Sequence, residues 1–410
     1  MTEDARQRVN WYLNILLVVL AFSIPLYRKW VSTAVPLVTI LWFVEGRWPE
    51  KTAILKRHRL SLAVAAFVTF SALSLAWTAD LAEGLDYLEK YRYLLLIPVI
   101  TTSLRGHFRT LVESWFVAGT VLSVALSGLV FAGVMRIRDA YPGNPSPFMS
   151  HLDYSMVLAV AALIALTRAV EESTPAGRRA AWVAAFCLVT GGLLINIGRS
   201  GQAAFVVAVI VVIPLVLWQR SPKLAITATA GAVIALAVTY AAVKPFQHRV
   251  DAGIHELTTA VHEGRYDTNQ GKRVAGAVVA LDMIRERPVL GTGIGANMIR
   301  FRELLESRHQ ELSPLVAWFP HLHNQYLQTA TETGLVGLVL LLAVFAALVA
   351  GPYMDPHDRH VACLLAVIYL VGFLGDPYLH KQLPLVLFAT FAGLASARGR
   401  SLFWDVTRET

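Results

Sequence analysis

Two histidines followed by an asparagine open a long apolar stretch in the sequence WFPHLHNQYLQTATETGLVGLVLLL (318–342). An imidazole at a membrane surface titrates near neutral pH and is therefore suited to remove a proton from a sugar hydroxyl. His321 and His323 both have this chemistry, and their spacing does not decide between them. The plainer alternative is an interfacial histidine bonded to a backbone carbonyl. Asn324 and Tyr326 are neighbouring candidates for binding a substrate.

A second candidate is the sequence GRSGQ (198–202), at the junction of two apolar stretches. Ser200 is expected to cap the helix that follows, and the free N–H groups of a helix N-terminus attract anions. Arg199 beside that terminus can hold a phosphate or diphosphate through its fork of donors. Gln202 is a further substrate-binding candidate. The alternative is an arginine that only reaches from the apolar region to the lipid headgroups.

Arg273 is a third candidate, placed just before VAGAVVALDMIRER (274–287). Apolar residues recur there at helical spacing until Pro288 ends the run. A basic residue entering a helix that lies on the membrane can face an anionic lipid, whereas an arginine in a solvated loop is the simpler interpretation. The glycines of GTGIG (291–295) do not indicate a dinucleotide site, because no strand precedes them.

His151 and Asp153 form a weaker group, directly after the loop YPGNPSP (141–147). Polar side chains that point together into an outer cavity would suit a carbohydrate. The alternative is that they only cap the start of a helix.

Glu332 lies nine residues beyond His323, and therefore on the opposite side of a regular helix. We expect it to hydrogen-bond a neighbouring helix and not to orient the imidazole. An acid within a membrane span is nevertheless a functional candidate in its own right. Gly334 and Gly337 predict a close contact between two helices.

The elements that must position these residues are membrane helices. Of the 410 residues, 56% are hydrophobic and 16% are charged, and the mean hydropathy is +0.54. Soluble domains are about 45–50% apolar and about 25% charged, so most of this chain is expected to lie in lipid. We predict an all-α polytopic membrane protein with about twelve transmembrane helices. The expected spans are 11–27, 30–46, 59–78, 91–104, 111–135, 150–169, 180–198, 202–219, 223–243, 323–351, 360–375 and 383–397.

Residues 244–322 depart from this pattern and are expected to form a large outer loop with amphipathic helices of its own. The loop separates transmembrane helices one to nine (1–243) from helices ten to twelve (323–397), which a cytoplasmic tail follows (398–410). Basic residues are more frequent on the loops assigned to the inside, so both termini are placed there. One such inner cluster consists of Arg47, Lys51, Lys56, Arg57 and Arg59.

Several classes of site are missing from the sequence. There is no DxD motif on an outer loop, no HExxH and no Walker-type glycine loop, which disfavours a metal-dependent mechanism and ATP-driven transport. Cys187 and Cys363 both lie in apolar runs and indicate neither a disulfide nor a metal site. The net charge of +8 is spread over the loops, so we expect no nucleic-acid partner, and we expect no cofactor and no metal.

Three of these sequences, in this order, resemble the O-antigen ligase family, which shares a membrane core with the O-antigen polymerases. They are GRSG with Arg199, Arg273 with the following helix and RPVLGTGIG (287–295), and the block HLHNQYLQTATETGLVGL (321–338). The likeness extends over about residues 60 to 395. The last block is moderately specific, whereas the first two are weak alone.

The resemblance implies a GT-C-like glycosyltransferase of lipopolysaccharide biosynthesis in the bacterial inner membrane, with its active site facing the periplasm. Its donor would be an O-antigen polysaccharide on undecaprenyl diphosphate, and its acceptor a sugar of the lipid A–core. By likeness, Arg199 and Arg273 would bind the diphosphate and stabilise the leaving group. His323 would deprotonate the acceptor hydroxyl in a metal-independent, inverting displacement. Membrane lipids would be the remaining partners.

Two other functions stay open at this point. A polymerase of the same superfamily would lengthen the lipid-linked glycan instead of delivering it to lipid A. A transporter or flippase, from a different class, would use an acid such as Glu332 and a repeated fold, but the sequence shows no repeat.

Overall fold

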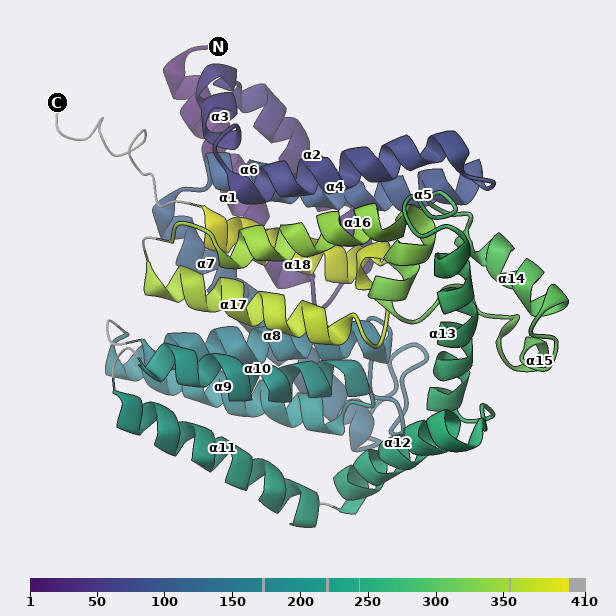
Figure 1. The fold of residues 1–410 in the computed structure, drawn as a ribbon. Coiled ribbons are helices and arrows are strands. Elements are labelled where there is room, and N and C mark those ends of the chain that lie inside the picture. Colours follow the sequence, from purple (N-terminus) through teal and green to yellow (C-terminus); the bar gives the residue numbers. More distant parts are fainter. Residues whose placement is uncertain (172–173, 219–220, 243, 354, 398–410) are drawn as a thin grey trace.

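The computed structural model describes residues 1–171, 174–218, 221–242, 244–353 and 355–397, and within these ranges it contains helices and no β-strand. In Figure 1 the long helices α4, α8, α9, α10, α16, α17 and α18 lie side by side, and α13 runs across one end of them. The first helices are α1 Glu3–Ser23, α2 Arg28–Glu45, α3 Trp48–Leu55, α4 Arg59–Leu73, η1 Ser74–Trp77, α5 Leu81–Tyr91, η2 Arg92–Leu95, α6 Leu96–Ser103, α7 Gly106–Phe131, α8 His151–Val170 and α9 Ala176–Ile195. The others are α10 Arg199–Trp218, α11 Pro222–Ala242, α12 Lys244–Glu263, α13 Asn269–Glu286, α14 Asn297–Ser307, α15 Ser313–Val316, α16 Gln325–Val349, α17 Pro356–Gly372, η3 Tyr378–His380 and α18 Gln382–Ser396.

Seven of the described helices are long and apolar enough to cross a membrane, so the chain is a polytopic all-α membrane protein. They are α4 with η1, α7, α8, α9, α10, α11 and α16. The apolar helices α17 and α18 are shorter, with 17 and 15 residues, and they pack among these seven together with α1. The short stretch 91–104, expected from the sequence as a span, divides into the 3-10 turn η2 and the eight-residue α6 and is not among these seven. Pro98 lies in the first turn of α6, where its missing N–H is tolerated.

Helix α8 lies at the centre of the bundle, and 83% of its most apolar stretch is buried inside the protein. Small residues allow its neighbours to approach closely, which is how helices associate in lipid. These residues are Ala159, Ala161, Ala162 and Ala165. In helix α11, by contrast, only 6% of the corresponding stretch is buried, so most of its side chains are expected to face lipid.

Residues 244–322 contain α12 to α15 and pack around a small hydrophobic core of their own. The expected helix at 274–287 corresponds to α13, which Thr268 caps by accepting the N–H of Gly271 at 3.0 Å. Phe301 from α14 and Phe319 from the following loop are buried in this core. The segment is therefore a folded helical layer and not an open loop.

Helix α16 is broken at Gly334, whose φ of 67° and ψ of −168° are available almost only to glycine. The turns after Pro288 insert their backbone into the break. Leu335 N–H donates to Pro288 O at 2.8 Å, and Gly293 N–H donates to Glu332 O at 2.8 Å. The prediction that Gly334 and Gly337 mark a helix–helix contact is therefore wrong, since Gly334 binds a loop and a Cβ on Gly337 would meet Thr333 of its own helix.

We expect Gly334→Ala to destabilise the protein. A Cβ there would lie 2.1 Å from Val289 O, and the backbone conformation itself costs a non-glycine residue about 1–3 kcal/mol. Gly231→Ala in α11 is the matched control, because it has open space around it and alanine favours a helix. Thermal unfolding in detergent should show a lower Tm for the first variant only. An unchanged Tm would mean that the break in α16 is not built as described.

Candidate functional site

Helices α8 and α10 meet at their first turns, and this contact explains the glycines of GRSG. A Cβ on Gly198 would lie 2.3 Å from His151 O, and one on Gly201 would lie 2.4 Å from Ser155 O. Ser155 Oγ also accepts the Gly201 N–H at 3.2 Å. The close approach places Arg199 beside the start of α8. Because α10 begins at Arg199, Ser200 is inside its first turn, and the prediction that Ser200 caps this helix is wrong.

The turn before α10 is held by Asn196 and Gln202. Asn196 Oδ1 accepts the Gly198 N–H at 2.6 Å, and Gln202 Nε2 donates to the carbonyl oxygens of Leu193 and Asn196 at 2.9 and 2.8 Å. The amide of Gln202 is therefore used within the fold to close the turn, and a contact with substrate stays a prediction.

The loop that carries the two histidines is fixed at both ends by α16. Gln328 Oε1 accepts the N–H of Leu322, between the histidines, at 3.0 Å. Asn324 caps the helix by accepting the N–H of Leu327 at 3.1 Å. His323 itself has a φ of 50°, which is rare for a residue with a side chain. Such strain, held by surrounding bonds, is typical of functional positions.

Asp376, in the connection between α17 and α18, is the group that sequence reasoning missed. Its side chain is fully buried, and its Oδ1 lies 3.4 Å from His323 Nδ1. Its Oδ2 accepts a charged hydrogen bond from Lys381. Burial alone would raise the pKa of Asp376, but the imidazole of His323 and the ammonium of Lys381 outweigh it and hold the pKa at about 2. The carboxylate therefore stays ionised beside the imidazole.

The two histidines have different environments. His321 Nδ1 accepts the backbone N–H of His323 at 3.3 Å, so this nitrogen is already used. Burial lowers the pKa of His321 to about 4, despite the nearby charge of Asp376. A group with that pKa is a weak base at neutral pH. His323, in contrast, directs Nδ1 towards a carboxylate, which is the arrangement that leaves Nε2 free to accept a proton.

Arg199 is the first residue of α10, and Arg273 lies near the start of α13. The electrostatic neighbours of Arg273 include Asp376, Tyr378 and Arg199, and burial lowers the pKa of its guanidinium. Arg199 reaches towards α12, where its Nη1 is 3.7 Å from the position of a Cβ on Gly253. Within the described ranges neither arginine forms a hydrogen bond or an ion pair. Two partly buried, unpaired guanidinium groups are a receptor for an anion such as diphosphate.

Two further basic groups border the arginines. Arg249 on α12 donates to Asn196 O at 3.4 Å and was not singled out in the sequence. Lys381 also lies 3.6 Å from Asp153 Oδ1, and it thereby joins the start of α8 to Asp376. His151 lies among the charges of Lys381, Asp153, Asp376 and Arg273. The candidate site is thus positively charged except for the two carboxylates.

Tyr326 is the predicted site residue that the structure turns away from the others. Its hydroxyl donates to Leu370 O at 2.6 Å, at the end of α17. This bond and that of Gln325 N–H to Phe373 O at 2.8 Å tie α16 to α17. Both bonds place the histidine loop over the connection that carries Asp376.

Glu332 is linked to the histidine loop although its helix face is different. Its Oε1 accepts a hydrogen bond from Gln328 at 2.7 Å, and the same Gln328 holds Leu322. Its Oε2 lies 3.4 Å from His380 in η3. Glu332 therefore contacts a neighbouring element, as expected, and its additional bond within α16 supports the histidine loop through Gln328.

His321, His323 and Asp376 are close enough to hold a metal ion by distance, since one ligand atom of each lies within 4.8 Å of the others. Two observations oppose a cation there. Lys381 already donates to Asp376, and Arg273 adds a second positive charge close by. The local charge favours an anionic ligand.

Part of the chain is similar in sequence to known proteins. A family model described as O-antigen ligase matches residues 183–342, which include α10, the helical layer, the histidine loop and the break in α16. An uncharacterized protein of Haemophilus influenzae is 24% identical over 172 residues, which are 40% of this chain and 42% of that protein. The chain therefore spans less than half of this relative's length.

We expect Asp376→Asn to lower activity by about 10²- to 10⁴-fold, as for other carboxylates that orient a histidine base. The amide can hold the position but cannot stabilise an imidazolium. Since the pKa of Asp376 is depressed to about 2, its ionised form stabilises the fold above pH about 4 and this contribution is lost as the pH falls through the folded value. The measurement is kcat against pH, with the KM for donor compared in parallel. A purely structural role would change Tm and leave the pH profile of the remaining activity unaltered.

Proposed function

We propose that this chain, whose residues 183–342 match a family model described as O-antigen ligase, transfers a lipid-diphosphate-linked polysaccharide to a sugar hydroxyl of lipid A–core. Its membrane helices and this match support a place in the O-antigen ligase/polymerase superfamily. The reaction is an inverting glycosyl transfer on the periplasmic side of the inner membrane. The donor is an undecaprenyl-diphosphate-linked O-antigen.

The observation that carries this proposal is a histidine that faces a buried carboxylate, with Arg273 near the same carboxylate and Arg199 near Arg273. His323 Nδ1 faces Asp376 at 3.4 Å, while Arg199 and Arg273 offer charge with no acidic partner in the described part of the chain. A glycosyl transfer from a diphosphate needs these two functions and no second carboxylate, because diphosphate is already a good leaving group.

The chemical step follows from these positions. His323 Nε2 takes the proton of the acceptor hydroxyl while its oxygen forms a bond to the anomeric carbon of the donor. The bond from that carbon to the diphosphate oxygen breaks, and its electron pair leaves with the diphosphate. Arg199 and Arg273 stabilise the growing negative charge, and Asp376 stabilises the imidazolium. Attack from the side opposite the leaving group inverts the anomeric centre.

The choice of His323 as the base has its own test. In His321→Asn the amide oxygen can still accept the His323 N–H, so we expect less than about a tenfold loss of activity. In His323→Asn the base itself is removed, and we expect a loss in the range of about 10²- to 10⁴-fold. Initial rates of purified variants, at matched protein and donor concentrations, give the comparison. The opposite order of losses would assign the base to His321.

The superfamily also contains polymerases, and product analysis separates the two activities. Purified protein is given a defined undecaprenyl-diphosphate glycan with and without a lipid A–core acceptor. A ligase forms glycosylated lipid A and leaves the donor glycan at its original length. Longer glycan on the lipid diphosphate, formed without acceptor, would replace the ligase proposal by the polymerase.

A further inference from the structure

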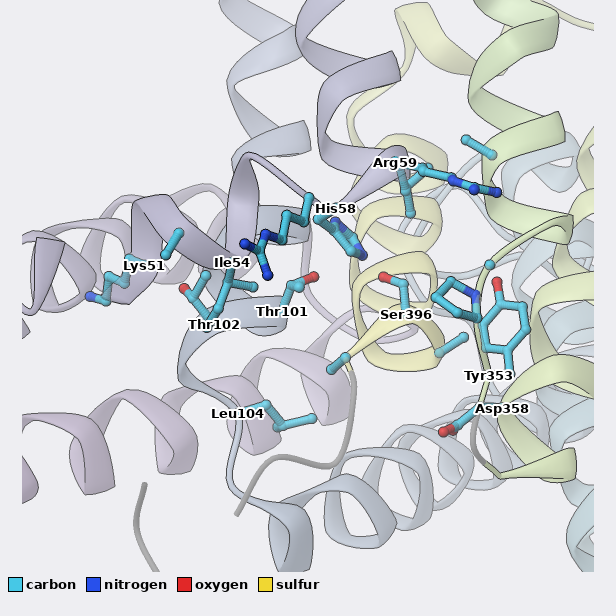
Figure 2. Close-up of a pocket in the computed structure, with 18 of the residues that line it drawn as sticks. Lys51, Ile54, His58, Arg59, Thr101, Thr102, Leu104, Tyr353, Asp358 and Ser396 are labelled. Atoms are coloured by element: carbon cyan, nitrogen blue, oxygen red, sulfur yellow. The ribbon is translucent and has the colours of Figure 1, made fainter. Parts of the chain in front are cut away.

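A large cavity lies far from the candidate site, at the other end of the bundle. It has a volume of about 1070 Å³ and is shown in Figure 2. Helix α16 begins directly after the histidine loop, and Ala347 near its end lines the cavity. Helix α18 begins after Lys381, and Ser396 at its end lines the cavity as well. At about 1.5 Å per residue, helices of 25 and 15 residues keep the two places at opposite ends of the bundle.

Most charged groups around the cavity are already paired. Lys51 lies 2.8 Å from Glu45 and, in Figure 2, points away from the centre of the cavity. Arg109 is paired with Asp358. The pairing of these buried or half-buried groups leaves them little capacity for a further ligand.

Arg57 and Arg59 are the exceptions. Both line the cavity, and the described residues provide neither with an ion pair or a hydrogen bond. The two remaining lining acids do not face them as partners: Asp355 caps α17 by accepting the N–H of His357 at 2.9 Å, and Glu50 is exposed in the first turn of α3. The cavity therefore has an excess of positive charge that an anion would neutralise.

The rest of the wall is mainly apolar, with one unsatisfied hydroxyl. In Figure 2 His58, Thr101, Ser396 and Tyr353 surround the open space. Thr101 Oγ1 is buried and has no hydrogen-bond partner, which is costly unless a ligand supplies one. Apolar wall is supplied by side chains of α3, α4, α16 and the chain after α6, namely Ile54, Leu60, Leu104 and Ala347. A wall of this composition fits a molecule with a charged head and an apolar body.

We infer that this cavity binds an anionic phospholipid. Its phosphate lies between Arg57 and Arg59, its glycerol region meets Thr101, and its acyl chains follow the apolar wall. Arg57 and Arg59 belong to the basic cluster that the distribution of charges places on the cytoplasmic side, where anionic lipids attract such residues. The binding site is separate from the proposed transfer reaction and does not depend on it.

Native mass spectrometry of the detergent-purified full chain tests this inference with phosphatidylglycerol and phosphatidylcholine as probes. Wild type should retain one phosphatidylglycerol in preference to phosphatidylcholine. Each arginine is expected to contribute about fivefold in affinity, so Arg57→Gln with Arg59→Gln should weaken retention by more than tenfold. The matched control is Lys56→Gln with Arg178→Gln, which removes the same charge from exposed positions that do not line the cavity.

Several outcomes would overturn the inference. Equal retention by the double arginine variant and its control would show that the cavity does not select the lipid. Competition by soluble glycerol phosphate, at the concentration at which the lipid binds, would identify a soluble phosphate ligand instead. A variant truncated after Ala397, the last described residue, is the final check, and it is expected to bind the lipid as the full chain does. If only the shortened chain binds it, the cavity is not a lipid site in the complete protein.

Discussion

His323→Ala is expected to lower kcat for the proposed transfer by about a thousandfold. Removal of a general base usually costs about 10²- to 10⁴-fold. The reason is geometric. His323 Nδ1 lies 3.4 Å from Asp376, whereas His321 Nδ1 accepts a backbone N–H and the pKa of His321 is lowered to about 4 by burial. His321 Nδ1 also lies 3.8 Å from Asp376 Oδ1, but this nitrogen is already used by the backbone of His323.

The measurement is the initial rate of transfer at saturating donor and acceptor. KM for the donor should change little, because the arginines that bind the diphosphate are intact. The control is His255→Ala, an exposed histidine on α12 outside the site. Retention of more than a tenth of the wild-type kcat by a folded His323→Ala protein would remove His323 from the role of base.

The second large effect is expected for Arg273→Ala and for Arg199→Ala, each of which should lower kcat/KM by about 10²- to 10³-fold. Losses of this size are typical when a positioned group that stabilises transition-state charge is removed. Both guanidinium groups lack an acidic partner in the structure as described, and the pKa of Arg273 is lowered by burial. A bound diphosphate would satisfy both. Because the charge on the diphosphate grows as the bond breaks, kcat should fall together with donor affinity.

Lysine variants separate geometry from charge at these positions. Arg273→Lys keeps the charge but loses the planar fork of donors, so we expect activity between those of wild type and the alanine variant. Arg265→Ala is the matched control, since its side chain is 62% exposed within the same helical layer. If Arg273→Ala and Arg265→Ala lose activity equally, Arg273 acts through the folding of the layer and not through the diphosphate.

The sequence identified the type of fold and part of the site. Most of the predicted spans correspond to one helix each. The span at 59–78 comprises α4 and η1, and the stretch at 91–104 divides because Pro98 fits the first turn of α6 and not the middle of a span. The histidines, Arg199 and Arg273 could be selected because each lies in a short segment of distinctive composition. What they bind or donate to is a tertiary question, and Gln202, Asn324 and Tyr326 prove to bond within the fold.

Asp376 could not be found by the same reasoning. It lies in the sequence GDPYLHK (375–381), between two apolar helices, and matches no short motif. Its role depends on the pairing of α16 with α17, which brings this connection against the histidine loop. The break at Gly334 was hidden for a similar reason, because a glycine in an apolar run indicates close packing without identifying the partner. One signal was available in the sequence, namely an aspartate and a lysine bracketing a histidine outside the spans.

Purified protein in detergent with EDTA, supplied with a defined undecaprenyl-diphosphate glycan and a lipid A–core acceptor, provides the most direct test of the proposed transfer. Wild type should form glycosylated lipid A in the presence of the chelator, with inversion at the anomeric carbon, whereas folded His323→Ala should not. Product formation that stops in EDTA and returns with a divalent metal would contradict the proposal, because the histidines and Asp376 would then hold a metal ion instead of acting as base and carboxylate.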